Sequence, residues 1–359
     1  MSRQRMLFLA EKALECQKSL IASNLIFQYT LLDMNRILSL LAISLVLSVF
    51  SSLVFTTNND TNMPIINAIS NELADGSLKL ILDQTEELGA FRKINDPYPE
   101  DKNFTGHYPT RDGLDQLHYS ASAQFSEAGL NELQEKLAQK DLIIIDLRRE
   151  SHGFINGLPV SWMNIQNGWS NLDLNTEAIS EEEKALLKAA QKEEHVVINK
   201  VVKEEGNKEL IPMPTTVKRT STERNLTAKL GIGYVRIPIC DHKRPLDEEI
   251  DTFISFYRTK PETSWVHFHC KGGSGRTTTL LVMVDMMHNA KQLSFDTIMD
   301  RQMLINEKNF LVASTPIAKQ FFAEFEERRL FLREFYNYCK ENQDNFATSW
   351  ATYLTKKPA

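Results

Sequence analysis

Apolar residues recur at helical spacing in several parts of the chain. Leu130, Leu133 and Leu137 follow Ser126, whose hydroxyl suits a helix N-cap. Ser180 precedes three glutamates, which favour the positive end of a helix dipole. The predicted helices span Ser126–Gln139, Ser180–Lys192, Gly275–His288 and Pro316–Lys340. Within them, Glu181–Glu183 and Glu324–Arg329 are expected to face solvent.

Short apolar runs between these helices predict buried strands. They span Asp141–Leu147, Gly233–Ile239 and Trp265–His269. His195–Arg219 alternates β-branched residues around Glu205-Gly206-Asn207, which predicts a β-hairpin and a β-rich insert around 193–222. Because strands alternate with helices, the pattern indicates an α/β fold.

The beginning of the chain has a different pattern. Ile37–Asn59 carries no charge and follows Met34-Asn35-Arg36, so residues 34–56 resemble a secretory signal or an uncleaved membrane anchor. Residues 1–33 are then an upstream extension, 57–90 a lead-in with a short helix, and 91–359 the main domain. Phe91–Tyr108 is expected to be loop. We therefore expect export to the periplasm, the medium or a host cell, with membrane contact only through the N-terminal segment.

Composition excludes several classes of protein. The 359 residues are 42% hydrophobic and 25% charged, as in globular proteins. The net charge of −6 argues against a general nucleic-acid binder. Four scattered cysteines fit neither a disulfide framework nor a cysteine-rich zinc site. No metal or cofactor is expected.

The segment from His269 to Thr278 carries the clearest chemistry. It places a cysteine, five residues and an arginine between a predicted strand and a predicted helix. Its glycines allow backbone N–H groups to converge on an anion at a helix N-terminus. These amides and the guanidinium would also hold a cysteine as a thiolate nucleophile. The residues of this loop are Cys270, Lys271, Gly272, Gly273, Ser274, Gly275 and Arg276.

Such a thiolate needs an acid to protonate the leaving oxygen. Asp241 follows a predicted strand and precedes His242, Lys243 and Arg244, so we assign it as general acid and later as base. Supporting roles are expected for His269, which would orient the loop, and Thr277, which would donate a hydrogen bond to sulfur. Asp146, Arg148 and Glu150 are predicted to form a polar network behind the site, and His152 and His267 to be structural.

These motifs resemble those of the cysteine phosphatases, and within them the protein-tyrosine-phosphatase-like phytases. The resemblance rests on Ile145–Gly157, Ile239–Pro245 and Trp265–Thr279, and extends over roughly residues 90–355. It implies a phosphatase core with a twisted mixed sheet flanked by helices, plus a small, partly β-barrel subdomain. It further implies stepwise hydrolysis of myo-inositol hexakisphosphate through a phosphocysteine. By the same resemblance, His242, Arg92, Lys308 and Lys319 would contact substrate phosphates.

Other functions remain open at this level. Lys271 inside the loop also suits a phosphoinositide headgroup, so a phosphoinositide or protein-tyrosine phosphatase is the alternative enzyme. A pseudoenzyme that binds phosphate is disfavoured because cysteine, arginine and acid are all present. The expected partner is a small inositol phosphate and no nucleic acid. The order of phosphate removal and the oligomeric state are left open.

Overall fold

The computed structural model describes residues 78–83, 88–99, 107–138, 141–165, 167–204, 207–306, 310–311 and 319–356. All of them belong to one compact unit, Ile65–Ala359. The predicted extension 1–33, the segment 34–56 and most of the lead-in lie outside these residues. None of the helices within the described ranges combines the length and apolar character needed to cross a bilayer.

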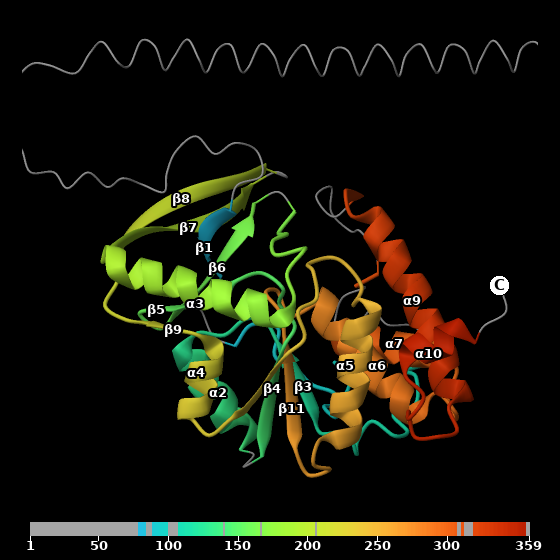
Figure 1. The fold of residues 1–359 in the computed structure, drawn as a ribbon. Helices are drawn as coiled ribbons and strands as arrows, with labels where there is room; N and C mark the ends of the chain where they lie inside the picture. The colour runs from blue at the N-terminus through green and yellow to red at the C-terminus, as the bar shows by residue number, and fades with distance from the viewer. Residues whose placement is uncertain are drawn as a thin grey trace, which may run out of the picture. The chain divides into compact units, whose positions relative to one another are not determined.

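A five-stranded sheet forms the centre of the fold (Figure 1). Its strand order is β10-β4-β11-β3-β2. The strands are β2 (Arg92–Lys93), β3 (Tyr119–Ser122), β4 (Leu142–Asp146), β10 (Gly233–Arg236) and β11 (Trp265–His269). The four strands from β10 to β3 are parallel, and β2 pairs antiparallel with β3. The strands predicted at 141–147, 233–239 and 265–269 are thus confirmed, and the structure shows that they are neighbours.

Helices cover both faces of this sheet, which explains why its strands are continuous apolar runs. In Figure 1, α2 and α4 lie on one side of the sheet, and α5, α6, α7, α9 and α10 lie on the other. The helices are α2 (Glu127–Leu137), α4 (Glu223–Lys229), α5 (Asp247–Thr259), α6 (Gly275–Asn289), α7 (Phe295–Asn306), α9 (Phe322–Glu341) and α10 (Trp350–Thr355).

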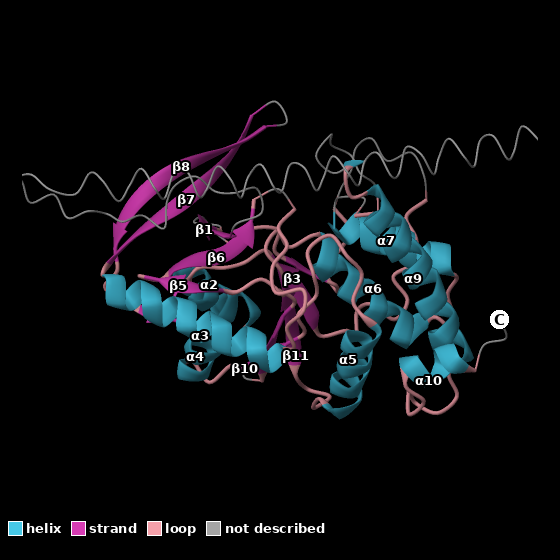
Figure 2. Cartoon of the chain, turned by 45° about the horizontal axis from the view of Figure 1, so that its top comes forward, coloured by secondary structure: helices cyan, strands magenta, loops and turns pink. Residues whose placement is uncertain are grey.

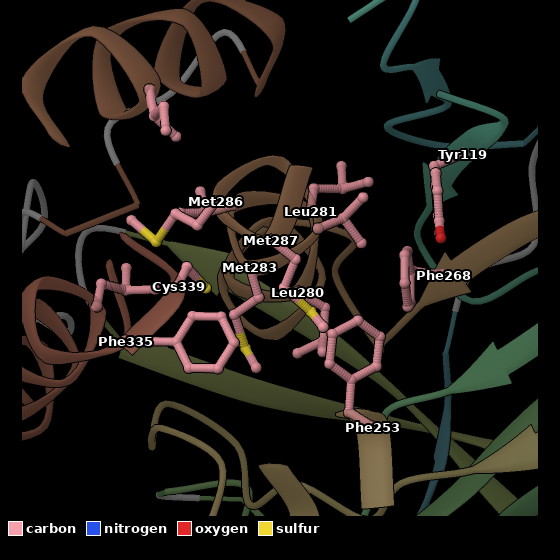
Figure 3. Packing of buried hydrophobic residues seen from close by; sticks show 14 of the residues in the cluster. Tyr119, Phe253, Phe268, Leu280, Leu281, Met283, Met286, Met287, Phe335 and Cys339 are labelled. Carbon is pink, nitrogen blue, oxygen red and sulfur yellow. The ribbon is translucent and has the colours of Figure 1, made fainter. Parts of the chain in front are cut away.

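Helix α6 is the centre of the larger apolar cluster. Its residues from Arg276 to Met287 are all buried, as expected of a helix that is apolar on every side. Figure 3 shows Met283 and its neighbours on α6 packed among Phe253 of α5, Phe335 of α9 and Phe268 of β11. This packing fixes the N-terminus of α6, and with it the loop that follows β11.

A second sheet has six strands in the order β8-β7-β1-β6-β5-β9, and α3 (Thr176–Glu193) packs against it. The strands are β1 (Leu78–Leu82), β5 (His152–Ile155), β6 (Leu158–Asn164), β7 (His195–Glu204), β8 (Asn207–Thr216) and β9 (Thr220–Ser221). Figure 2 shows β7 and β8 as the long hairpin at one edge, where the sequence predicts a β-hairpin. The edge strands of this sheet are β8 and β9, and a closed barrel would require them to pair with each other. The pairings therefore do not confirm the barrel-like subdomain.

Some boundaries differ from the sequence-based predictions. Helix α2 begins after Ser126, whose side chain accepts a hydrogen bond from the amide of Gly129, as predicted. Helix α3 begins four residues earlier than Ser180, because Asn175 accepts from the amide of Ala178 and caps the helix there. The lead-in includes β1, a strand in the interior of the six-stranded sheet that the sequence analysis missed.

Candidate active site

The candidate catalytic loops meet at one edge of the five-stranded sheet. Because β3, β4, β10 and β11 are parallel, the segments that follow them all leave from their carboxyl ends, where α/β proteins bind ligands. Backbone hydrogen bonds continue between these segments, from the amide of Gln124 to the carbonyl of Lys271 (3.1 Å) and from the amide of Leu147 to the carbonyl of His269 (3.0 Å).

The loop 270–275 is held in a conformation that requires glycine at one position. Gly273 has φ of +67°, and a Cβ there would lie 2.6 Å from the carbonyl carbon of Ser122 and 2.8 Å from its oxygen. By contrast, a Cβ on Gly272 would meet nothing within 4 Å. Close approach of the loop to β3 therefore depends on Gly273. The thiol of Cys270, at the start of the loop, is free and buried.

Arg276 is held by a buried carboxylate. Its Nη1 donates to Oε2 of Glu150 (2.7 Å) and its Nη2 to Oε1 (3.0 Å), a two-pronged contact. Burial by itself lowers the pKa of Arg276, but Glu150 and Asp241 raise that pKa well above its ordinary value. The Nε–H is buried and has no hydrogen-bond partner in the described part of the chain. The guanidinium edge formed by Nε and Nη2 is therefore oriented to receive an anion.

Asp241 lies against the same guanidinium. Its Oδ1 is 3.2 Å from Nη2 of Arg276, and its side chain is 25% exposed. The indole Nε1 of Trp169 donates to the backbone carbonyl of Asp241 (2.9 Å). A Cβ on Gly168, whose φ is +77°, would lie 3.0 Å from Oδ2 of Asp241. The segment 168–169 after β6 therefore packs on the carboxylate and restricts its position.

Helix α9 contacts the other side of the segment that carries Asp241. The ring of His242, which has φ of +65°, stacks on Phe321 with centroids 3.8 Å apart. Arg328 donates from Nη2 to the carbonyls of His242 (2.6 Å) and Lys243 (3.2 Å). The expectation that Glu324–Arg329 faces solvent is wrong for Arg328, which is 1% exposed because it turns toward this segment.

The basic residues predicted around the site have different partners. Nζ of Lys271 lies 2.9 Å from Oδ1 of Asp83, at the end of β1. Arg92 donates from Nη1 to the carbonyl of Gly273 (2.8 Å) and from Nη2 to Oγ1 of Thr278 (2.9 Å), so it supports the loop from its strand, β2.

Other predicted cations lie farther from the loop or outside the described residues. Lys243 lies over the ring of Trp169, and Arg244 pairs with Asp247 and Glu327. Lys319 is exposed just before α9, and Lys308 lies outside the described residues.

A network of buried charges lies behind the loop, as predicted for Asp146, Arg148 and Glu150. Arg148 contacts Glu150 (2.9 Å) and Asp83 (2.8 Å), which joins the two sheets. His152 contacts Asp146 (3.3 Å); burial alone lowers the pKa of a histidine, but this carboxylate raises the pKa of His152 to about 10. His267 contacts Ser120 and Ser122 in the interior, as expected of a structural histidine.

His269 connects the loop to helix α4. Its Nε2 lies 2.7 Å from Oε1 of Glu223, near the start of that helix. Burial alone raises the pKa of a carboxyl group, but His269 and His152 lower the pKa of Glu223 to about 2. Oγ1 of Thr277 is buried and has no hydrogen-bond partner among the described residues, and its predicted bond to the departing sulfur stays a prediction. Within the same residues, no group of three or more His, Cys, Asp or Glu has an arrangement that could hold a metal.

The sequence singled out Cys270, Arg276 and Asp241 as candidates, and Asp241 lies against Arg276 in the structure, but several residues that contact these segments were missed. Asp83 had a usable signal, since a carboxylate directly follows the mainly apolar run Leu78–Leu82. For Trp169 and Arg328 no such signal exists, because their contacts join segments far apart in the chain and depend on how α9 and the loop after β6 pack.

Comparison with known proteins gives a consistent family. Residues 145–288 match the family of protein-tyrosine-phosphatase-like phytases, whose description names inositol hexakisphosphate. A tandemly repeated phytase of this type from Mitsuokella multacida superposes with a TM-score of 0.70 at 34% identity, covering 80% of this chain and 50% of that one. A phytase from Bdellovibrio bacteriovorus gives a TM-score of 0.61 at 30% identity, covering 84% of this chain and 99% of that one.

A curated relative adds a second line of similarity. "Effector protein hopD2" of Pseudomonas syringae pv. tomato is 28% identical over 249 residues, which are 68% of this chain and 53% of hopD2. The chain therefore spans about half the length of hopD2 and of the Mitsuokella protein. The fold, the loop from Cys270 to Arg276 and the match to the Bdellovibrio enzyme over nearly its whole length agree. This chain belongs to the protein-tyrosine-phosphatase-like phytase family.

Proposed function

We propose that this protein is a phosphatase that removes phosphate groups stepwise from myo-inositol hexakisphosphate and lower inositol polyphosphates. The observation that carries this proposal is the position of Asp241, whose carboxylate lies 3.2 Å from the guanidinium of the arginine that ends the Cys270 loop. In this proposal Cys270 is the nucleophile, Arg276 binds the phosphoryl group, and Asp241 is the acid. Family membership supports inositol phosphates as the substrate class.

The proposed reaction has two steps. In the first, the thiolate of Cys270 attacks phosphorus, the ester P–O bond breaks, and Asp241 gives its proton to the departing alcohol oxygen. In the second, Asp241 takes a proton from water, the water oxygen attacks the phosphocysteine, and the S–P bond breaks to release inorganic phosphate and the thiolate. The Nε–H of Arg276 and the second N–H of Nη2 would bind two phosphoryl oxygens in both steps, because Glu150 takes one N–H from each of Nη1 and Nη2.

Charged side chains around the loop support a substrate with several phosphates. Lys271 lies in the loop, and His242 and Lys243 directly follow Asp241. Lys271 pairs with Asp83, and a substrate phosphate that replaced Asp83 would leave Lys271 with a charged partner. A hexakisphosphate could engage several such groups, each contributing about 1–3 kcal/mol through a charge-assisted hydrogen bond. The mechanism needs no metal ion for these steps.

The test is phosphate release from inositol hexakisphosphate with a chelator present. Cys270→Ser is expected to abolish release, because a serine hydroxyl is a much weaker acid and a much poorer nucleophile than a cysteine thiol. Cys339→Ser, a buried thiol of α9, is the matched control and is expected to retain turnover. Wild-type activity should follow a bell-shaped pH profile, and Asp241→Asn should remove the fall on its alkaline side.

Three results would contradict the proposal. Turnover that survives in Cys270→Ser would exclude the phosphocysteine. A higher kcat/KM for a phosphotyrosine peptide or a phosphoinositide than for inositol hexakisphosphate would replace the substrate class with the alternative phosphatase. Tight binding of inositol phosphate without turnover would identify a phosphate-binding pseudoenzyme.

We also propose that the protein is exported. The uncharged residues 37–59 and the similarity to hopD2, which is described as an effector, support this proposal. Fractionation of cells that express the complete chain with a C-terminal tag should place it outside the cytoplasm. A tag found only in the cytoplasm would refute export.

A further inference from the structure

Arg328 of α9 is a buried cation that the two-step reaction leaves without a role. Its side chain turns into the protein, whereas Arg329, its neighbour on α9, is 46% exposed and pairs with Glu326. Nη2 of Arg328 donates to two successive backbone carbonyls, those of His242 (2.6 Å) and Lys243 (3.2 Å). We call residues 240–244 the acid segment, since Asp241 is among them.

The same guanidinium reaches the catalytic loop. Its Nη1 and Nη2 lie 3.5 and 3.6 Å from the point that a Cβ on Gly275 would occupy, at the start of α6. Nη1 also donates to the carbonyl of Phe310 (3.2 Å). One side chain of α9 thus bonds to the acid segment and lies beside the end of the loop that carries Cys270.

The charge of Arg328 is not neutralised locally. Among the described residues, no carboxylate lies within 4.0 Å of its guanidinium, and its Nε is buried with no hydrogen-bond partner. Burial lowers the pKa of Arg328 to about 10, and the nearby anionic forms of Asp241 and Cys270 act in the opposite direction. Burying a cation without an ion-pair partner is costly. The hydrogen bonds of Arg328 to backbone carbonyls and the negative charge of the site must therefore hold it in place.

We propose that Arg328 is a positioning residue that fixes the acid segment against the Cys270 loop, so that Asp241 is aligned with the leaving oxygen. This inference rests on the proposed phosphatase function. It differs from a general structural role in one respect: loss of Arg328 should impair proton donation to the leaving group more than attack on phosphorus.

Leaving-group dependence separates these two roles. Inositol hexakisphosphate releases an alcohol, which needs a proton as it departs, whereas p-nitrophenyl phosphate releases a stable phenolate that needs little help. A positioned general acid contributes roughly 10²–10⁴-fold, so partial misplacement should cost about 10–100-fold. We expect Arg328→Gln to lower kcat/KM by that factor for inositol hexakisphosphate and by less than about 5-fold for p-nitrophenyl phosphate.

Three further variants complete the kinetic test. Arg328→Lys keeps one charged donor and should recover part of the lost activity. Arg329→Gln is the matched control on the same helix and should behave as wild type, because its ion pair is exposed. Combined with Asp241→Asn, Arg328→Gln should cause no further loss, because two residues acting in one step are not additive. Equal losses on both substrates, or additive losses in the double variant, would overturn the proposal.

A measurement that needs no turnover distinguishes failure of this inference from failure of the proposed function. The amide of Lys243 bonds to the carbonyl of Cys240 (3.2 Å) and closes the acid segment. In Arg328→Gln, hydrogen exchange of a peptide covering 239–246 should be faster, while peptides from α3 should be unchanged. If wild type hydrolyses neither substrate, the proposed function fails, and exchange still decides the inference. Unchanged exchange in the acid segment refutes it. Should Arg328→Gln not fold, the same comparison is made with Arg328→Lys.

Discussion

Single residues at this site act through specific parts of their side chains. Arg276 uses Nη1 and Nη2 to bind Glu150, which leaves the edge with Nε for an anion. Arg92, a side chain expected to contact substrate, donates to the carbonyl of Gly273 and to Thr278. The loop is therefore shaped by two arginines, one bound to a carboxylate and the other to the loop itself.

At the residue scale, the two central glycines of the loop should respond differently to alanine. We expect Gly273→Ala to lower the free energy of unfolding by about 2–4 kcal/mol, because its Cβ would collide with the backbone of β3 at a positive φ. Gly272→Ala should change that free energy by less than about 0.5 kcal/mol. Urea unfolding of both variants measures the difference. Equal destabilisation would show that the loop does not pack on β3 as described.

At the scale of elements, helix α3 shows how a cap sets a boundary. Both Asn175 and Ser180 are residue types that cap helices, and the acidic residues after Ser180 favour a start there. The structure begins the helix after Asn175, and Ser180 instead donates from its hydroxyl to the carbonyl of Thr176 inside the helix. The earlier start lets Ile179 join the buried face of α3 together with Leu187.

The two candidate caps can be compared directly. Asn175→Ala should lower the free energy of unfolding by about 1 kcal/mol, because the amide of Ala178 loses its acceptor. Ser180→Ala should change it by no more than about 0.5 kcal/mol, since alanine is the better residue inside a helix. Thermal or urea unfolding monitored by circular dichroism checks both. A larger effect at Ser180 would place the start of the helix where the sequence pattern favours it.

At the scale of the whole compact unit, buried ion pairs connect the two sheets. Asp83, at the end of β1 in the six-stranded sheet, contacts Arg148 after β4 and Lys271 in the catalytic loop. Burial alone would raise the pKa of Asp83, but Arg148 and Lys271 lower that pKa below its ordinary value. Glu150 and Glu223 behave in the same way beside Arg276 and His269.

These shifts predict how stability depends on pH. A carboxyl group whose pKa is depressed on folding stabilises the protein above its unfolded pKa, near 4, and this contribution is lost as pH falls through the folded pKa. His152, with its pKa raised to about 10, stabilises the folded state below its unfolded pKa of 6.5, and this is lost as pH rises toward 10. The unfolding temperature should therefore fall below about pH 4, and fall again as pH rises from about 6.5 to about 10.

Asp83→Asn tests the acid side of this profile. At pH 7 it should lower the free energy of unfolding by about 3 kcal/mol, because Arg148 and Lys271 lose a buried anion. The difference from wild type should shrink as pH falls and Asp83 of the wild type becomes protonated. Asp115→Asn, an exposed partner of Arg111, should cost less than about 0.5 kcal/mol at any pH. A difference for Asp83→Asn that stays constant down to pH 2 would contradict the ionic role.

The sequence by itself determined three of the central strands and helices α2 and α6, and it singled out the loop from Cys270 to Arg276, because these depend on local periodicity and on residues adjacent in the chain. Asp241 could also be singled out as a candidate, since it follows an apolar strand within a basic segment. Tertiary packing alone decided that β1 enters the second sheet, that Arg92 turns into the loop, and that Arg328 and Trp169 hold the acid segment. Those contacts join residues up to 186 positions apart, such as Arg92 and Thr278, and no spacing along the chain records which distant backbone will lie beside a side chain.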